Sequence, residues 1–252
     1  MINEKTIKDN LINKNIDIVI KETTNSTNDD VKSYVGSSKL AVVIAENQIK
    51  GRGRNNRSFY SPSGKGVYMS ILLTPNLPIT DGVKITTFIA VAVANAIEKL
   101  SGLKVGIKWV NDLFINGKKV CGILTESGVD FKTKKLSYAV CGIGINCYGL
   151  DFPSEISSIA TSLEKEGKKI DRNLLIAEIL NNLSCIESEI LSGNYLAEYK
   201  NRSIILNKQV TVVSGQETFT AIAVDITDSG ALIVNKNGEL VTVNSGDVSI
   251  RL

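Results

Sequence analysis

Apolar residues recur along the first 150 positions in short blocks with the length and spacing of β-strands. Residues 40–45 form a continuous apolar run, which is typical of a buried strand, whereas residues 16–20 alternate between apolar and polar. Blocks of one kind or the other occupy residues 16–20, 40–45, 67–73, 105–110, 113–115, 119–125 and 136–145. The pattern predicts a sheet of many strands in this part of the chain.

Three other segments have helical signals. Residues 25–35 begin with amide and hydroxyl side chains followed by acidic residues, as a helix start does. Thr80 and Asp81 can cap a helix that runs to about Leu100. Asp171 can cap a third helix, with apolar residues at helical spacing as far as residue 191. This part of the chain is therefore predicted to contain both helices and strands.

Turn signals define two further features. Asn116-Gly117 lies between apolar blocks and favours a type I′ hairpin, because both turn residues need positive φ. After Ser203 the chain changes to five short strand-like segments separated by tight turns, which is typical of a small antiparallel barrel. We therefore expect a larger domain at residues 1–202 and a barrel at residues 203–252.

Composition excludes several kinds of chemistry. The 252 residues are 43% hydrophobic and 22% charged, as in ordinary globular proteins, and the net charge of +3 is too small to indicate nucleic-acid binding by itself. The chain has no histidine, which excludes imidazole-based catalysis and most zinc catalysis. Cys121, Cys141, Cys147 and Cys185 form no Cys-x-x-Cys pair, so we interpret them as free thiols.

The N-terminus has neither the basic start nor the apolar run of a signal peptide, and no apolar segment is long enough to cross a bilayer. We therefore expect a cytoplasmic protein without a membrane partner. Only about fifteen residues precede the first predicted strand, which is too few for a DNA-binding domain, so no DNA partner is expected.

The segment from Gly51 to Arg57 has the composition of an anion-binding loop. Glycine lets the backbone approach a ligand closely, and Arg52, Arg54 and Arg57 could hold carboxylates or phosphates by paired hydrogen bonds. A solvated basic loop or a nucleic-acid contact remains an equal alternative. The segment fits neither the G-x-G-x-x-G pattern nor the P-loop pattern.

Polar groups also lie at the ends of three predicted strands. Residues 108–112 (Lys-Trp-Val-Asn-Asp) could hold phosphates and a divalent metal, or simply form a turn. Lys119 begins an apolar strand and could neutralise a developing negative charge, whereas Lys118 fits a surface hairpin lysine better. Gly142 and Gly144 indicate either a close approach to the strand or tight packing.

Taken in order, these segments resemble the biotin protein ligase family. The matching runs are residues 26–28 (Ser-Thr-Asn), 45–48 (Ala-Glu-Asn-Gln), 51–54 (Gly-Arg-Gly-Arg) with Arg57, 59–62 (Phe-Tyr-Ser-Pro), 108–112, 119–124 (Lys-Val-Cys-Gly-Ile-Leu), 142–146 and 245–251. They extend over nearly the whole chain. The resemblance implies an α+β catalytic domain of the class II synthetase type, with a mixed sheet flanked by helices, followed by an SH3-like barrel.

The resemblance also implies roles for the matched residues. Lys119, with Arg52 and Arg54, would be catalytic, and Lys119 would contact the biotin carboxyl and the α-phosphate. Phe59 would pack near adenine, and no residue is assigned as a metal ligand. Residues that would contact biotin or the nucleotide are Ser26, Thr27, Asn28, Gln48, Gly51, Arg52, Gly53, Arg54, Arg57, Phe59, Lys108, Asn111, Asp112, Lys119, Gly122, Gly142, Gly144, Asn146 and Arg251.

The implied activity is that of a ligase-only biotin protein ligase, which uses ATP and Mg²⁺ to form biotinyl-5′-AMP and pyrophosphate. Biotin would then pass to a lysine of a biotin carboxyl carrier protein domain, and the ligase could be a homodimer. A lipoate protein ligase and a non-enzymatic biotin sensor remain alternatives. Two positions depart from the family pattern: Val110 stands where proline is frequent, and Asn56 stands where glycine is common.

Overall fold

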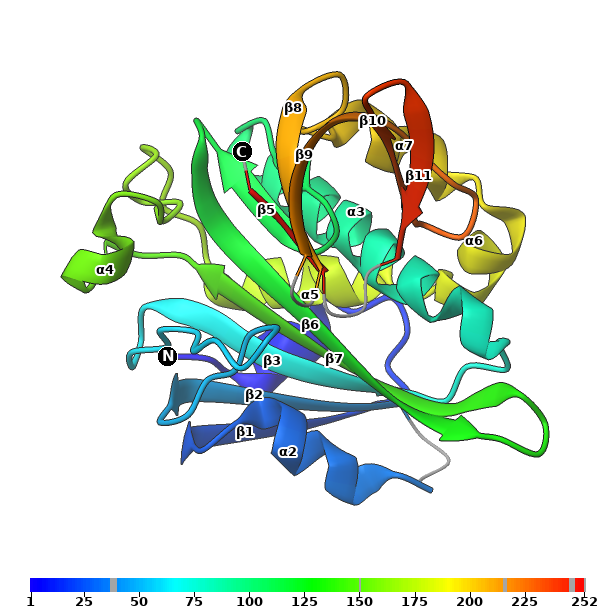
Figure 1. Cartoon of the computed structure of the whole chain (residues 1–252). Coiled ribbons are helices and arrows are strands. Elements are labelled where there is room, and N and C mark those ends of the chain that lie inside the picture. The colour runs from blue at the N-terminus through cyan, green and yellow to red at the C-terminus, as the bar shows by residue number, and fades with distance from the viewer. Residues whose placement is uncertain (37–39, 150, 215–216, 245–247, 252) are drawn as a thin grey trace.

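The computed structural model describes residues 1–36, 40–149, 151–214, 217–244 and 248–251, and these form two sheets with their helices (Figure 1). The helices are α1 (Glu4–Asp9), α2 (Thr27–Val31), α3 (Gly82–Ser101), α4 (Ser154–Ser157), α5 (Arg172–Asn182), α6 (Ile186–Ser192) and α7 (Tyr195–Arg202). The strands are β1 (Ile16–Thr24), β2 (Leu40–Gln48), β3 (Gly66–Leu73), β4 (Gly106–Lys108), β5 (Asp112–Ile115), β6 (Lys118–Asp130), β7 (Lys135–Asn146), β8 (Gln209–Ser214), β9 (Glu217–Ile226), β10 (Leu232–Lys236), β11 (Glu239–Val243) and β12 (Val248–Arg251).

The first sheet has seven strands in the order β1-β2-β3-β7-β6-β5-β4, and it is mixed because β1 and β2 are parallel while the other pairs are antiparallel. Both of its faces are covered. On β2, Val42 and Ile44 belong to the core shared with α3 and α5, whereas Ala41 and Val43 pack on the other face with Val31 of α2. Burial on both faces explains the continuous apolar run of β2. The predicted mixed sheet flanked by helices is confirmed.

The second sheet is antiparallel, with five strands in the order β11-β10-β9-β8-β12, and it confirms the predicted SH3-like fold. In Figure 1 it lies at the top of the view, and its β9–β10 turn is next to α3 at Val83. Residues 245–247 of the C-terminal signature lie outside the described residues, and so do the side chains of residues 248–251. The proposed division at residue 203 stays a prediction. Within the described residues, no helix is long and apolar enough to cross a membrane.

Several local predictions are confirmed. Asn116 and Gly117 have φ of 50° and 80°, and Ile115 pairs with Lys118 across them, as a two-residue type I′ hairpin requires. The Asp171 carboxylate accepts a hydrogen bond from the Asn173 amide and caps α5.

Other local predictions are wrong in detail. The helix predicted from residue 171 to 191 is two helices, α5 and α6. Between them the Ser184 amide bonds to the Asn181 carbonyl and the Ile186 amide to the Leu183 carbonyl, so the chain makes tight turns after Asn182. Asp81 makes no side-chain cap at α3 and pairs instead with Lys84 at 3.2 Å.

The strand predicted at residues 105–110 is also shorter than expected. It ends at Lys108, which pairs with Asp112, so residues 109–111 form the turn between β4 and β5. The Trp109–Val110 peptide in this turn is cis.

A buried ion pair fixes the start of the chain to the first sheet. Glu46 on β2 accepts hydrogen bonds from Arg172 of α5 at 2.6 Å and from the Ile2 amide at 2.7 Å. Burial raises the pKa of the Glu46 carboxyl, but the hydrogen bonds from Arg172 and Ile2 outweigh it and hold the pKa below its ordinary value. The pair is therefore ionised in the folded protein.

Glu46→Gln should lower the free energy of unfolding by about 3–5 kcal/mol near neutral pH, because Arg172 would stay charged and buried without its partner. Since the folded pKa of Glu46 is lowered, its contribution is present above the unfolded pKa and is lost as pH falls through the folded pKa. The urea unfolding curves of the wild type and of Glu46→Gln should therefore converge in acid.

The control is Glu4→Gln, which removes the exposed pair of Glu4 with Lys8 and should change the free energy of unfolding by less than about 0.5 kcal/mol. If Glu46→Gln lowers the free energy of unfolding no more than Glu4→Gln does, the buried ion pair of Glu46 and Arg172 is not a major source of stability.

Candidate active site

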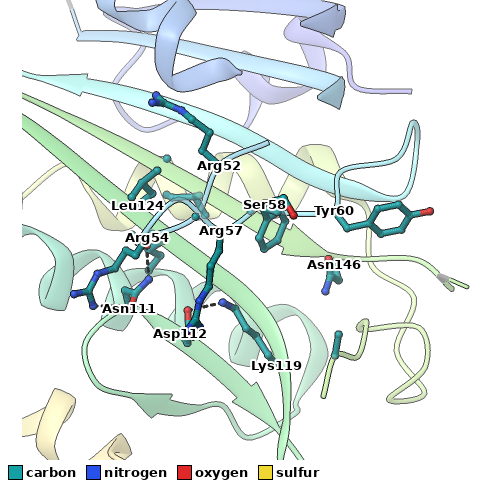
Figure 2. Close-up of a pocket in the computed structure, with 18 of the residues that line it drawn as sticks. Arg52, Arg54, Arg57, Ser58, Tyr60, Asn111, Asp112, Lys119, Leu124 and Asn146 are labelled. Carbon is teal, nitrogen blue, oxygen red and sulfur yellow. Dashed lines mark hydrogen bonds and ion pairs between the residues drawn. The ribbon is translucent and has the colours of Figure 1, made fainter. Parts of the chain in front are cut away.

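A cavity of about 600 Å³ opens on the face of the first sheet that also carries α2 (Figure 2). Its walls come from α2, β2, the loop between β2 and β3, the turn between β4 and β5, strands β6 and β7, and residues 152–160. Of the residues predicted to bind ligand whose side chains the structure describes, all line this cavity except Gly51. Gly51 lies at the base of the loop, where a Cβ would overlap the Phe59 carbonyl, and the Arg251 side chain is outside the described part.

The floor of the cavity is a part of the sheet that contains three glycines. Gly122 on β6 pairs with Gly144 on β7, and Gly142 pairs with Leu124. A Cβ on Gly144 would lie 2.5 Å from the Phe59 ring, and one on Gly142 would overlap the amide oxygen of Asn28. Of the two alternatives left open for these glycines, the structure shows tight packing, because side chains from other segments take the space above them. A ligand contact at these glycines stays a prediction.

A β-bulge turns Lys119 into the cavity. Phe114 pairs with Lys119, but Leu113 pairs with Cys121, so Val120 is an extra residue. Strict alternation would put Lys119 on the opposite face from Gly122, and the bulge brings both to the same face. The Lys119 Nζ atom would lie 3.2 Å from a Cβ on Gly122, which places the ammonium beside this floor.

One end of the cavity is neutral and polar. Gln48 Oε1 accepts hydrogen bonds from the Thr27 amide at 3.0 Å and hydroxyl at 3.1 Å. The Thr27 hydroxyl also lies 2.7 Å from that of Ser70, which donates to Asn28 Oδ1 at 2.5 Å. Ser26, Thr27 and Asn28 are each 3% exposed. These groups form one connected network, which fixes their orientation.

Arg52 connects the glycine-arginine loop to this neutral end. Its guanidinium donates to Asp29 at 2.7 Å and to Glu126 at 2.9 Å, while Glu126 also accepts from the Asn28 amide at 2.7 Å. Figure 2 shows Arg52 and Arg54 leaving the loop in opposite directions. The structure therefore places the Arg52 charge away from Lys119.

The other end of the cavity is cationic. Lys119 pairs with Asp112 at 2.6 Å, and Arg54 donates to Asn111 Oδ1 at 3.4 Å (Figure 2). The described lining contains one carboxylate, that of Asp112, and the cations Arg52, Arg54, Arg57, Lys108 and Lys119. This excess of positive charge favours an anionic ligand.

The buried thiols behind the floor take no part in this chemistry as thiolates. Burial raises the pKa of Cys141 and Cys147 to about 12 and raises that of Cys121 further. All four cysteines are free, as predicted, and Cys185 is exposed. The described residues contain no group of three Cys, Asp or Glu side chains that could hold a metal ion.

Two residues of the site were missed in the sequence. Ser70 is fully buried on β3 and joins Thr27 to Asn28, and Glu126 on β6 joins Asn28 to Arg52. Strand alternation could have identified Glu126, because it is four residues from Gly122 and so lies on the same face of β6. Ser70 could have been identified as a serine inside an otherwise apolar strand.

Comparison with known proteins shows the family to which this chain belongs. The sequence model of the Biotin/lipoate A/B protein ligase family matches residues 19–146, and that of the Biotin protein ligase C terminal domain matches residues 205–251. The chain belongs to the biotin/lipoate A/B protein ligase family.

Relatives agree with this membership. The chain is 35% identical over 215 residues to a bifunctional ligase/repressor BirA of Bacillus subtilis, covering 83% of this chain and 66% of that protein. It is 29% identical over 263 residues to a biotin--[acetyl-CoA-carboxylase] ligase of Mycobacterium tuberculosis, covering 98% of this chain and 95% of that protein. A biotin protein ligase from Aquifex aeolicus in complex with biotin and ATP superposes with a TM-score of 0.80 at 25% identity, covering 93% of this chain and 98% of that one.

Gly144→Ala should destabilise this ligase-family protein by about 1–3 kcal/mol, because the added methyl group would overlap the Phe59 ring against a backbone that cannot retreat. Gly82→Ala is the matched control. Gly82 begins α3 and a Cβ there meets nothing within 4 Å, so alanine should be neutral or slightly stabilising. Equal urea midpoints for the two variants would show that the floor tolerates a side chain.

Proposed function

We propose that this protein is an ATP-dependent biotin protein ligase that acts on a biotin carboxyl carrier protein domain. The observation that carries the proposal is the cavity with a neutral polar end and a cationic end, joined by a glycine-rich floor. Biotin has a neutral ureido head, an apolar body and a terminal carboxylate, so it matches the cavity from one end to the other. The names of the relatives support the same activity.

The hydrogen bonds of the neutral end favour biotin over lipoate. Glu126 accepts from the Asn28 Nδ2 atom, so Asn28 Oδ1 faces Ser70 and takes its hydroxyl proton. The single proton of the Thr27 hydroxyl then has two neighbouring acceptors, Ser70 Oγ and Gln48 Oε1. Acceptor capacity therefore exceeds the supply of protons. A ureido group brings two N–H donors, whereas the dithiolane ring of lipoate brings none.

The proposed first step joins biotin to AMP. The biotin carboxylate attacks the α-phosphorus of ATP in line, the bond to the β-phosphate oxygen breaks, and pyrophosphate leaves with its electron pair. The Lys119 ammonium and the guanidiniums of Arg54 and Arg57 offset the negative charge that develops at the α-phosphate. In the second step a carrier lysine attacks the mixed anhydride, and AMP leaves.

The chain's own residues hold Lys119 for this step. Its amide donates to the Ile159 carbonyl and its carbonyl accepts from the Thr161 amide, each at 2.8 Å. With the Asp112 pair at 2.6 Å, these bonds fix both the backbone and the ammonium of Lys119. Phe59 and Asn146 are proposed to lie beside the nucleotide, and Arg251 to reach the nucleotide or carrier.

Mg²⁺ fits the cationic end only as a companion of the nucleotide. Asp112 is the one carboxylate among the described lining residues, and Asn111 is beside it. Magnesium in nucleotide sites is commonly held by one or two carboxylates together with phosphates and water. Asp112, with Asn111, would therefore hold the ion, which would supply charge neutralisation of the phosphates. A cytoplasmic location and a homodimer remain predictions.

The decisive experiment supplies ATP, Mg²⁺ and either biotin or lipoate and seeks the acyl-adenylate by mass spectrometry. Biotinyl-AMP and labelling of a carrier domain are expected with biotin alone. Lipoyl-AMP alone would favour a lipoate ligase, and biotin binding without any adenylate would favour a biotin sensor.

Lys119→Ala should slow adenylate formation by about 10²–10³-fold, because an electrostatic group aimed at the reacting phosphate would be lost. The matched control is Lys118→Ala, since Lys118 is exposed in the same hairpin and does not line the cavity. Pyrophosphate release and circular dichroism should be measured together. Equal rates of pyrophosphate release in the two variants would show that Lys119 has no catalytic role.

Arg54→Gly should release the adenylate early. Arg54 lines the cavity and bonds to Asn111, and its loss would weaken the closed loop by about one charged hydrogen bond, which corresponds to roughly tenfold faster escape. The escaped mixed anhydride would then acylate exposed lysines of bystander proteins.

The measurement compares biotin attached to an unrelated lysine-rich protein by the Arg54→Gly variant and by the wild type, at equal rates of adenylate formation. Bystander labelling that does not exceed the wild-type level would contradict the role of Arg54 in retention.

A further inference from the structure

The C-terminal sheet reaches the wall of the cavity at Trp109. The side chain of Trp109 is 4% exposed and lines the cavity, and its indole N–H donates to the Gly230 carbonyl at 2.9 Å. Gly230 lies in the turn between β9 and β10. A side chain of the site is thus tied by one hydrogen bond to a backbone atom of the other domain.

The segment around Trp109 is held at nearly every residue. The Ile107 carbonyl accepts from the Ile204 amide at 2.9 Å, and the Val110 carbonyl accepts from the Tyr199 hydroxyl at 3.0 Å. Burial raises the pKa of Tyr199 well above its ordinary value, so this hydroxyl keeps its proton. The segment is therefore clamped between α7, the C-terminal domain and its own sheet.

The same segment ends in the groups that face the proposed reaction. Asn111, two residues after Trp109, accepts from Arg54 at 3.4 Å and donates to the Ile123 carbonyl at 2.6 Å. Asp112, the next residue, pairs with Lys119 at 2.6 Å. A shift at Trp109 would move both partners, because three residues of a clamped turn leave little freedom between them.

The Gly230 turn is itself fixed. Its amide donates to the Thr227 carbonyl at 2.8 Å, and the Thr227 amide donates to the Ala231 carbonyl at 2.8 Å. Gly230 has φ of 83°, and a Cβ there would lie 3.0 Å from Val83 on α3. The turn is packed against α3, so its carbonyl is presented to Trp109 from a rigid position.

We propose that Trp109 is a positioning residue through which the C-terminal domain holds Asn111 and Asp112, and thereby Arg54 and Lys119, in place for the reaction. The proposal rests on the proposed ligase function. It assigns the C-terminal domain an effect on turnover rather than on biotin binding. The neutral end is organised separately, by hydrogen bonds among α2, β2, β3 and β6.

Two variants break the contact from its two sides. Trp109→Phe keeps an aromatic ring but removes the N–H donor, and Gly230→Ala strains the turn and pushes it against Val83. The matched control is Gly238→Ala, at another positive-φ glycine of the same domain where φ is 96° and a Cβ meets nothing within 4 Å. Gly230→Ala and Gly238→Ala share the backbone strain of alanine at positive φ, but only the former reaches the contact.

The expected result is a fall in kcat for pyrophosphate release of about tenfold in Trp109→Phe and in Gly230→Ala, the usual effect of one hydrogen bond. The biotin Kd from calorimetry should stay within about twofold, and the double variant should be little slower than either single one. Gly238→Ala should keep the wild-type kcat. Equal kcat for Gly230→Ala and Gly238→Ala, or a loss of biotin affinity that matches the loss of kcat, would overturn the proposal.

Fluorescence separates this proposal from the ligase function. Trp109 is the only tryptophan of the chain, so its emission reports on this contact without any substrate. Gly230→Ala should shift the emission to longer wavelength, whereas Gly238→Ala should leave it unchanged. A wild-type protein that makes no biotinyl-AMP would overturn the ligase function. Identical emission from the wild type, Gly230→Ala and Gly238→Ala would overturn the positioning contact.

Discussion

A group of three glycines in the middle of the seven-stranded sheet is the constraint on which the site depends. Gly122 and Gly144 face each other across the β6–β7 ladder, and Gly142 lies two residues along. Side chains at these positions would take the space of the Phe59 ring or the Asn28 amide. Because the glycine-arginine loop and α2 can both lie directly on the sheet there, segments far apart in sequence meet around one cavity.

The bulge at Val120 is the second requirement, because it turns Lys119 to the face of the glycines. Lys119 lies beyond the part of β6 that pairs with β7, since that ladder extends only as far as Cys121. The amide and carbonyl of Lys119 bond instead to Ile159 and Thr161, in a segment that lines the cavity. The residue whose ammonium faces the floor therefore also anchors the segment beside it.

Sequence patterns predicted the sheet, the Asn116-Gly117 hairpin and most residues of the cavity, because these depend on local alternation, turn chemistry and distinctive motifs. They did not predict features set by tertiary contacts. Alternation alone assigns Lys119 to the wrong face, since a one-residue bulge leaves little trace in sequence. The break between α5 and α6 has no proline or glycine to mark it, and the role of Glu126 depends on two partners that lie far away in the chain.

The loop from Gly51 to Phe59 connects the two ends of the cavity. Whether it stays closed depends on the entropy cost of ordering it and on the free energies of its contacts. Arg52 shares Glu126 with Asn28 at the neutral end, and Arg54 bonds to Asn111 at the cationic end. Ordering such a loop costs roughly 1–2 kcal/mol per residue. A partly exposed ion pair such as that of Arg52 returns only about 0–1 kcal/mol, and each backbone hydrogen bond about 0.5–1.5 kcal/mol.

These internal contacts offset part of the ordering cost of the loop. Contacts from an anionic ligand at Arg54 and Arg57 would add to them and favour the closed arrangement. Because Arg52 is already engaged by two carboxylates, its main contribution is to join the loop to the pocket floor, where Asn28 shares Glu126. A ligand that contacts Asn28 at the neutral end thus favours the same closed loop that an anion favours from the cationic end.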